Sequence, residues 1–106
     1  MGETIEIKTE QLVHEFVWIF NDKADIEIIK EIDSANYGIG FDLDVKGIPC
    51  RLYDESIING IEFDNEDGCL KIEIDRLNSF TKEEQVNVAN YLKDIITQSG
   101  FMGTFE

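Results

Sequence analysis

Residues 41–53 read Phe41-Asp42-Leu43-Asp44-Val45-Lys46-Gly47-Ile48-Pro49-Cys50-Arg51-Leu52-Tyr53, and this stretch decides the fold. Apolar and acidic residues alternate over 41–45, which predicts a half-buried strand because successive side chains of a strand point to opposite faces. Lys46-Gly47 is a candidate tight turn, and residues 48–53 follow as the next strand. The same alternation returns at residues 61–64 and 70–75. Together these patterns predict an antiparallel meander.

The three alternating stretches carry carboxylates at their outward positions. Their apolar residues share one face of the predicted sheet, and the other face shows Asp42, Asp44, Glu62, Asp64, Glu73 and Asp75, relieved only by Lys71. Aspartate is a poor strand former, and like charges that face each other across strands are destabilising. Such a face indicates a surface that meets a partner, so these six carboxylates are candidate partner-binding residues.

Two amphipathic helices are predicted on either side of the strands. Thr9 is a candidate N-cap of the first helix, whose apolar stripe is Leu12, Val13, Phe16, Val17 and Phe20. Thr81 and Glu84 form a capping box at the start of the second helix. Gly100 stands where a left-handed residue is expected after that helix. The apolar stripe of the second helix is Val88, Ala89, Leu92, Ile95 and Ile96.

Two segments leave alternatives open. Residues 4–7 fit a short strand or a leading turn, and residues 25–33 fit a helical stripe or, preferably, an isoleucine-rich strand with a bulge near Ile29. Asn59-Gly60 and residues 65–68 are further turn signals. We expect a single α+β domain over residues 1–106, with an antiparallel β-sheet of about four to five strands in a meander, covered on one face by an N-terminal and a C-terminal helix.

The chain has 23 acidic and nine basic residues, which gives a net charge of −14. This charge disfavours direct binding to nucleic acid or to an anionic membrane, because both need Lys and Arg. It favours basic proteins, basic peptides or cations as partners, although plain solubility would also account for it. No apolar run approaches a membrane span, and Cys50 and Cys69 fit no metal or secretory pattern. We expect a cytoplasmic protein with two reduced thiols.

Signals for catalysis are weak. His14 is the only histidine, and no nucleophile signature accompanies it. Gly38-Ile39-Gly40 continues a strand instead of opening a helix, so a close backbone approach explains it better than a phosphate loop. Residues 64–68 have the composition of a calcium loop, but the register puts Phe63 and Ile74 where acidic ligands are needed. We expect no enzymatic activity, no cofactor and no dedicated metal site.

Trp18 lies off the apolar stripe of the first helix, on the side of Gln11, His14 and Asp22. A tryptophan beside polar residues is a candidate contact anchor. Packing of a second element over it, or half-burial at the flank of the domain, is the plainer explanation. The apolar tail, residues 100–106, is expected to fold back on the core, since otherwise it would promote self-association.

Carboxylates two residues apart on a strand are about 6.7 Å from each other, which is of the same order as successive phosphates of a nucleic-acid strand. Our leading hypothesis is therefore a small acidic inhibitor, monomeric when free, that occludes the basic nucleic-acid-binding surface of a nuclease, a toxin or a similar protein. An anti-CRISPR or anti-restriction counter-defence protein and an immunity protein or antitoxin fit equally. The alternative is a non-catalytic structural or assembly module that makes its contacts through Trp18 and the C-terminal tail. A small metal-dependent enzyme is the least favoured class.

Overall fold

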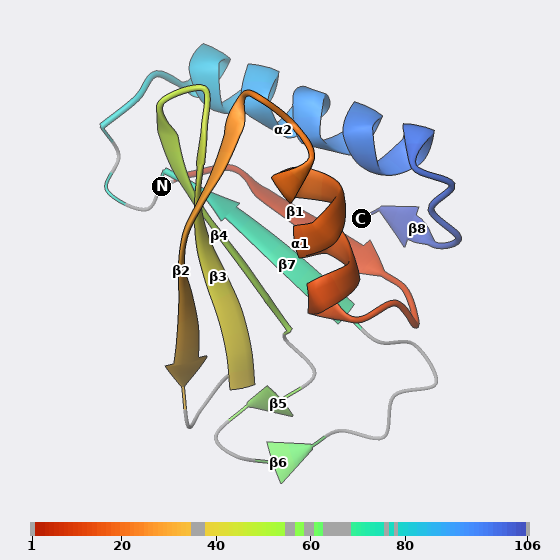
Figure 1. Ribbon diagram of the computed structural model, residues 1–106. Coiled ribbons are helices and arrows are strands. Elements are labelled where there is room, and N and C mark those ends of the chain that lie inside the picture. Colours follow the sequence, from red (N-terminus) through yellow and green to blue (C-terminus); the bar gives the residue numbers. More distant parts are fainter. Residues whose placement is uncertain are drawn as a thin grey trace.

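The structure is a computed structural model that describes residues 2–34, 38–54, 57–58, 61–62, 69–75, 77 and 79–105. These residues form an α+β fold with a six-stranded antiparallel sheet, a two-stranded sheet and two helices (Figure 1), which confirms the predicted fold class. The elements in chain order are β1 (Thr4–Lys8), α1 (Val13–Asn21), β2 (Ile26–Ser34), β3 (Gly38–Val45), β4 (Ile48–Asp54), β5 (Ile57–Ile58), β6 (Ile61–Glu62), β7 (Cys69–Ile74), α2 (Lys82–Gln98) and β8 (Thr104–Phe105).

The strand order in the large sheet is β2-β3-β4-β7-β1-β8. The part β2-β3-β4-β7 is a meander as predicted, except that the described part of the strand expected at 61–64 is not in it: β5 and β6 lie between β4 and β7 in the chain and form a separate sheet. The two ends of the chain add β1 and β8, so the expected number of strands was too low. The reason is that β1 pairs with a strand distant in sequence: Ile5 lies opposite Ile72, and Ile7 lies between Leu70 and Phe105. A four-residue alternation does not show where such a partner lies.

The segment that was ambiguous between helix and strand is the strand β2. Its pairing with β3 shifts register between Ile28 and Lys30, so the bulge expected near Ile29 is confirmed. The bulge leaves Ile29 53% exposed, while Ile26 is buried and Ile28 packs partly against the core. The extra residue of the bulge displaces the alternation, and this displacement produced the helix-like spacing of the isoleucines.

A two-residue turn joins β3 to β4, as predicted. Lys46 and Gly47 have φ values of +55° and +88°, which are the left-handed values of a tight hairpin turn. The Gly47 N–H donates a 2.8 Å hydrogen bond to the Asp44 carboxylate, which helps to fix the turn. A Cβ on Gly40 would lie 3.1 Å from the Leu52 carbonyl oxygen, so close strand pairing accounts for this glycine.

The acidic stretch at residues 61–64 does not join the large sheet in its described part. Ile61–Glu62 forms β6, which pairs with β5 in a separate sheet that places Glu62 opposite Ile57. The expectation that Glu62 belongs to the same sheet as Asp42 and Glu73 is therefore wrong. Pairing across a very short loop has a low entropic cost, and this favours the local partner. Asp64 and the turn signals at 59–60 and 65–68 lie outside the described residues.

The first helix begins later than the sequence suggested. Leu12 is its N-cap residue, and the Leu12 N–H donates to the Glu15 carboxylate at 2.8 Å. Thr9 instead accepts a hydrogen bond from the Gln11 N–H at 3.0 Å. Leu12 is exposed. The expected cap at Thr9 and the expected place of Leu12 in the apolar stripe are therefore both wrong.

The second helix agrees with its prediction. The Glu84 N–H donates to Thr81 Oγ1 at 3.2 Å, and the Thr81 N–H donates to Glu84 Oε1 at 3.1 Å, so the capping box is present. Gly100 follows the helix with a φ of +83°. The predicted stripe of this helix is buried.

The inward side chains of the large sheet and the stripes of both helices form one buried cluster. Both helices therefore cover the same face of the sheet, as expected. Phe16 and Phe20 of α1 and Leu92 and Ile96 of α2 are fully buried, and each such side chain contributes about 1.5–3 kcal/mol. The opposite, open face of the large sheet has no helix over it in the described part of the chain.

Candidate protein-binding surface

The open face of the large sheet consists of the outward side chains of its strands. Register places Asp42 opposite Arg51, and Arg51 opposite Glu73, in one row across β3, β4 and β7. Lys30 of β2 lies opposite Asp42 and extends the row. The outward ionisable groups of the described strands are the acidic Glu6, Glu27, Asp42, Asp44 and Glu73 and the basic Lys8, Lys30, Arg51 and Lys71. Charges of both signs therefore alternate on this face.

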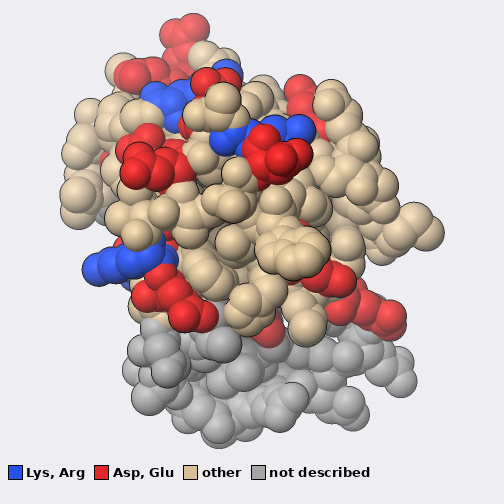
Figure 2. All heavy atoms as spheres, viewed as in Figure 1, with Lys and Arg blue, Asp and Glu red and all other residues tan. Residues whose placement is uncertain are grey.

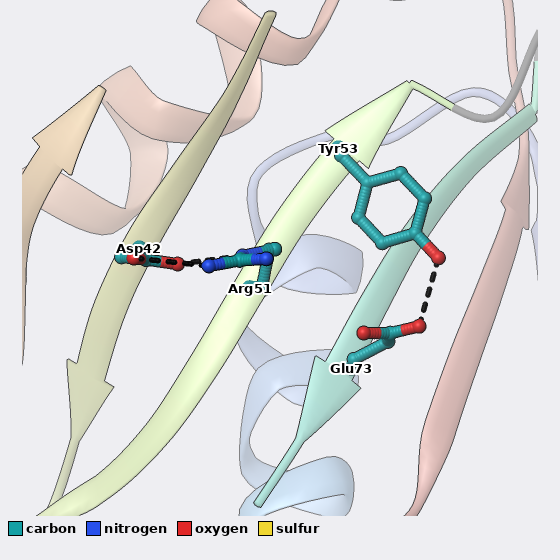
Figure 3. A network of polar contacts seen from close by, with 4 residues as sticks. All are labelled: Asp42, Arg51, Tyr53 and Glu73. Atoms are coloured by element: carbon teal, nitrogen blue, oxygen red, sulfur yellow. Dashed lines mark hydrogen bonds and ion pairs between the residues drawn. The ribbon is translucent and has the colours of Figure 1, made fainter. Parts of the chain in front are cut away.

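Asp42 and Arg51 form a bidentate ion pair (Figure 3). Arg51 Nε donates to Asp42 Oδ1 at 2.8 Å, and Arg51 Nη2 donates to Asp42 Oδ2 at 3.3 Å. The two side chains are 24% and 34% exposed, respectively. The hydrogen bond that Arg51 donates to Asp42 raises the pKa of Arg51, against the effect of burial and with support from the negative charges of Asp42 and Glu73. Asp42 is thus engaged within its own sheet.

The neighbouring groups of this face are also paired. The Tyr53 hydroxyl donates to Glu73 Oε1 at 2.9 Å (Figure 3), and Lys71 Nζ lies 3.8 Å from Glu6 Oε1. The expectation of an acidic face relieved only by Lys71 is therefore wrong. Arg51 and Tyr53 are outward residues of the strand predicted at 48–53. Alternation along residues 48–53 puts Arg51 and Tyr53 on the outward face, so the sequence pattern could have placed both beside the carboxylates.

Glu27 and Asp44 are an exception to this balance, because they lie directly opposite each other across β2 and β3. Glu27 is exposed, and its carboxylate forms no hydrogen bond or ion pair with the described part of the chain. Asp44 holds the Gly47 N–H of the hairpin turn. Two carboxylates in this arrangement repel each other. The loss of stability expected for an acidic sheet face is therefore limited to this pair among the contacts described above.

A hollow of about 470 Å³ lies on the open face beside Asp42 and Asp44. Its margin includes two exposed aliphatic side chains, Ile29 at 53% and Leu77 at 79% exposure. Ile29 is turned outward by the bulge of β2, and Leu77 lies in the loop that follows β7. This part of the open face therefore combines apolar contact area with charge.

Asp75 is fully buried, so its expected place among the outward carboxylates is wrong. It adopts a left-handed φ of +52° where the chain leaves β7. Its carboxylate accepts hydrogen bonds from the N–H groups of Ser79 and Phe80, at 3.0 and 2.9 Å, and from the Gln85 side-chain amide at 2.9 Å. Burial by itself would raise the pKa of Asp75, but these hydrogen bonds outweigh it and hold the pKa below its ordinary value. Asp75 therefore organises the loop that leads to α2.

Trp18 is 83% exposed. This confirms its predicted position off the apolar stripe and excludes the packed and half-buried explanations. A hollow of about 530 Å³ lies beside it and is lined by Trp18, Ile19, Asn21, Asp22, Lys23 and Ser99. Asn21 ends α1 and Ser99 caps α2, so the hollow lies where the C-terminal ends of the two helices meet. A role of Trp18 as a contact anchor stays a prediction.

The C-terminal tail folds back on the domain, as expected. β8 pairs with β1, and the Phe101 ring lies 5.8 Å from that of Phe16 and 5.2 Å from that of Phe105. Met102, between these contacts, is exposed. The two phenylalanine rings of the tail are therefore packed within the chain, whereas Met102 is not.

The histidine and the two cysteines, which were weighed as catalytic or metal-binding residues, lie in the following environments. The His14 ring packs edge-on against Phe41 at 5.6 Å, and its Nε2 is 3.9 Å from Glu31. Cys50 and Cys69 are free thiols. Burial of Cys50, aided by the charges of Asp44 and Asp75, raises its pKa to about 12, so this thiol is protonated at neutral pH. Over the described ranges, no group of three or more His, Cys, Asp or Glu residues is placed to hold a metal ion.

Comparisons with protein-family models, with curated proteins and with solved structures gave no match to this chain. None of the described helices combines the length and the apolar character that crossing a membrane requires. The function therefore has to be inferred from the surface of the protein.

Proposed function

We propose that the protein is a small, non-catalytic inhibitor that binds a basic nucleic-acid-handling protein, such as a nuclease or a toxin, and occludes its nucleic-acid-binding surface. The observation that carries the proposal is the charge excess of 23 acidic over nine basic residues. If every basic residue neutralised one carboxylate, 14 would still lack a basic partner in the chain. Such an excess attracts a basic surface over long range and gives fast, salt-sensitive association.

The positions of the carboxylates in the structure change which of them are proposed to contact the partner. Asp42 and Glu73 are engaged by Arg51 and Tyr53, and Asp75 lies inside the domain. Asp44, with Glu27 opposite, remains a candidate, together with Glu62 and Asp64. These last two belong to the segment 54–67, which has six acidic residues and no basic one, namely Asp54, Glu55, Glu62, Asp64, Glu66 and Asp67. Counter-defence and immunity settings are both compatible with this proposal.

A second candidate function is favoured by the exposure of Trp18. In that alternative the protein is a non-catalytic assembly module, the acidic surface serves solubility, and Trp18 anchors the contact. The tail contributes less than the sequence suggested, because Phe101 and Phe105 pack within the chain. The two candidates differ in a simple property, since an inhibitor of this kind should be monomeric when free and an assembly module should self-associate.

The test is affinity capture from host lysate at low salt, followed by elution with a salt gradient. We expect basic, nucleic-acid-handling proteins to be retained and to elute as the salt concentration rises. The double variant Glu62→Lys/Asp64→Lys should lose them. The matched variant Glu83→Lys/Asp94→Lys, which alters the net charge equally on α2, should retain them. Retention of acidic or neutral proteins, or equal loss in both double variants, would contradict the proposal.

A further inference from the structure

Trp18 lies between two carboxylates on the side of α1 that faces away from the core. Glu15 precedes it by three residues and Asp22 follows it by four, which is the spacing of neighbours on one helix face. All three side chains are exposed. Tryptophan is among the more strongly buried residue types on average, so a ring that is 83% exposed on a well-formed helix needs an explanation.

The two helix ends add negative potential at the same place. Asp22 and Ser99, the C-terminal caps of α1 and α2, both line the hollow beside Trp18. Neither helix has a basic residue in its last turn, so no side chain of the last turn offsets the partial negative charge of either C-terminus. Lys23 is the basic residue among the lining side chains, and it opposes this effect.

Figure 2 views the molecule from the side on which α1 lies in front of the sheet. The surface over α1 is largely uncharged, with acidic side chains at its lower margin and acidic and basic side chains together at its upper margin. An apolar centre with a charged rim is typical of protein–protein contact surfaces, in which tryptophan is enriched. The surface formed by Glu15, Trp18, Asp22 and the adjoining hollow is called the α1 surface below.

We infer that the α1 surface docks an arginine-bearing segment of the basic partner, with the guanidinium group stacked on Trp18 and paired with Asp22 or Glu15. The inference rests on the proposed function and names where that partner is held. A planar guanidinium can stack on an indole ring and donate paired hydrogen bonds to a carboxylate at the same time. The α1 surface offers both groups within one helical turn.

Two other occupants fit the α1 surface less well. A purely apolar segment would cover the Asp22 carboxylate without giving it a partner, and would leave Glu15 with only its hydrogen bond from the Leu12 N–H, which is costly. A second copy of this chain would bring the same acidic groups face to face in a two-fold contact, and each copy carries a net charge of −14. Only a basic segment satisfies both the ring and the carboxylates.

The probe for this inference is a fluorescein-labelled nona-arginine peptide, titrated by anisotropy against the full chain at low salt. Trp18→Ala should weaken its binding at least about ten-fold, as expected for an anchor residue. Asp22→Asn should weaken it about two- to five-fold, whereas Lys23→Gln should strengthen it. Asp94→Asn, on the exposed side of α2, removes the same charge as Asp22→Asn and should have a smaller effect. Because Trp18 is the single tryptophan, its emission should also respond saturably to the peptide.

Several outcomes would overturn the inference. Equal binding by Trp18→Ala and the wild type would show that the peptide binds elsewhere, and so would equal losses for Asp94→Asn and Asp22→Asn. If nona-lysine binds as tightly with the same dependence on Trp18, stacking of arginine is not the recognition mode. A shift of Trp18 emission with protein concentration alone would identify the α1 surface as a contact between copies.

This test is separable from that of the proposed function. If lysate capture succeeds but Trp18→Ala still retains the basic partner, the inference fails and the proposed function stands. If nona-arginine binds at Trp18 as described but no nucleic-acid-handling protein is captured, the proposed function fails and the α1 surface stands as a site for arginine.

Discussion

Charge reversal at Asp42 should destabilise the protein, although Asp42 is one of many carboxylates in a strongly acidic chain. Asp42→Lys removes the bidentate ion pair with Arg51, which is worth about 1 kcal/mol for a partly exposed pair. It also places a cation opposite Arg51 and Lys30, and each like-charged cross-strand contact costs about 0.2–1 kcal/mol. The expected loss of unfolding free energy is about 1–3 kcal/mol. The corresponding decrease in melting temperature is about 4–8 °C per kcal/mol.

Glu27→Lys is the matched control on the same face. A lysine there faces Asp44 and replaces a repulsive pair with an attractive one, so the protein should gain about 0.2–1 kcal/mol. Both variants change the net charge by the same amount, and only their neighbours differ. Urea unfolding at low salt measures the two effects, and about 1 M NaCl should shrink both because it screens exposed charges.

The sequence alone predicts the opposite result for Asp42→Lys, namely a gain in stability from relief of acidic repulsion. If Asp42→Lys stabilises the protein as much as Glu27→Lys does, the open face is uniformly repulsive and the charge-balanced description of it is wrong. The double variant Asp42→Lys/Arg51→Glu should recover the part of the loss that comes from the 42–51 contact, because it restores an opposite-charge pair in the reverse order. Recovery should be incomplete, because the new lysine still lies opposite Lys30 and the new glutamate lies opposite Glu73.

Three further predictions concern Asp75, Cys50 and nucleic acid. The pKa of Asp75 is lower in the folded state than its ordinary value of about 3.9. The ionised carboxylate therefore stabilises the fold above about pH 4, and this stabilisation is lost as the pH falls towards the folded-state pKa. Asp75→Asn should therefore lower the melting temperature at neutral pH and make the melting temperature depend less on pH below about pH 4. An unchanged melting temperature at neutral pH would contradict the role assigned to Asp75. Cys50, with a pKa of about 12, should resist iodoacetamide at neutral pH until the protein unfolds, and mass spectrometry showing modification of native Cys50 as fast as Cys69 would count against this. The protein should not bind DNA or RNA at physiological salt, and micromolar binding in a mobility-shift assay would refute both this prediction and the inhibitor proposal.

Local signals predicted much of the fold. The capping box at Thr81 and Glu84, the Lys46-Gly47 turn and the bulge near Ile29 each depend on a few neighbouring residues, and each is present in the structure. The places of β1 and β8 depend on pairing between residues far apart in sequence, which an alternation pattern does not encode. The start of α1 was misplaced because Thr9 can accept a hydrogen bond from the nearby Gln11 N–H without capping a helix.

The candidate surface was predicted less well, for two physical reasons. Strand alternation tells which side chains point outward, but register decides which charges become neighbours. Arg51 was therefore overlooked as the partner of Asp42. Alternation also continues through Asp75 in the sequence, whereas the backbone turns there and buries the carboxylate. Trp18 was placed correctly because helical periodicity alone puts it outside the apolar stripe.

The proposal that this protein occludes a nucleic-acid-binding surface is tested most directly by competition on the captured partner. The purified partner is first saturated with a fluorescein-labelled nucleic acid that it binds, and this protein is then titrated in while anisotropy is followed. The proposal predicts that the anisotropy falls to the value of the free nucleic acid, with saturation at one molecule of inhibitor per binding site. A rise in anisotropy, which would indicate a ternary complex with the nucleic acid still bound, would contradict it.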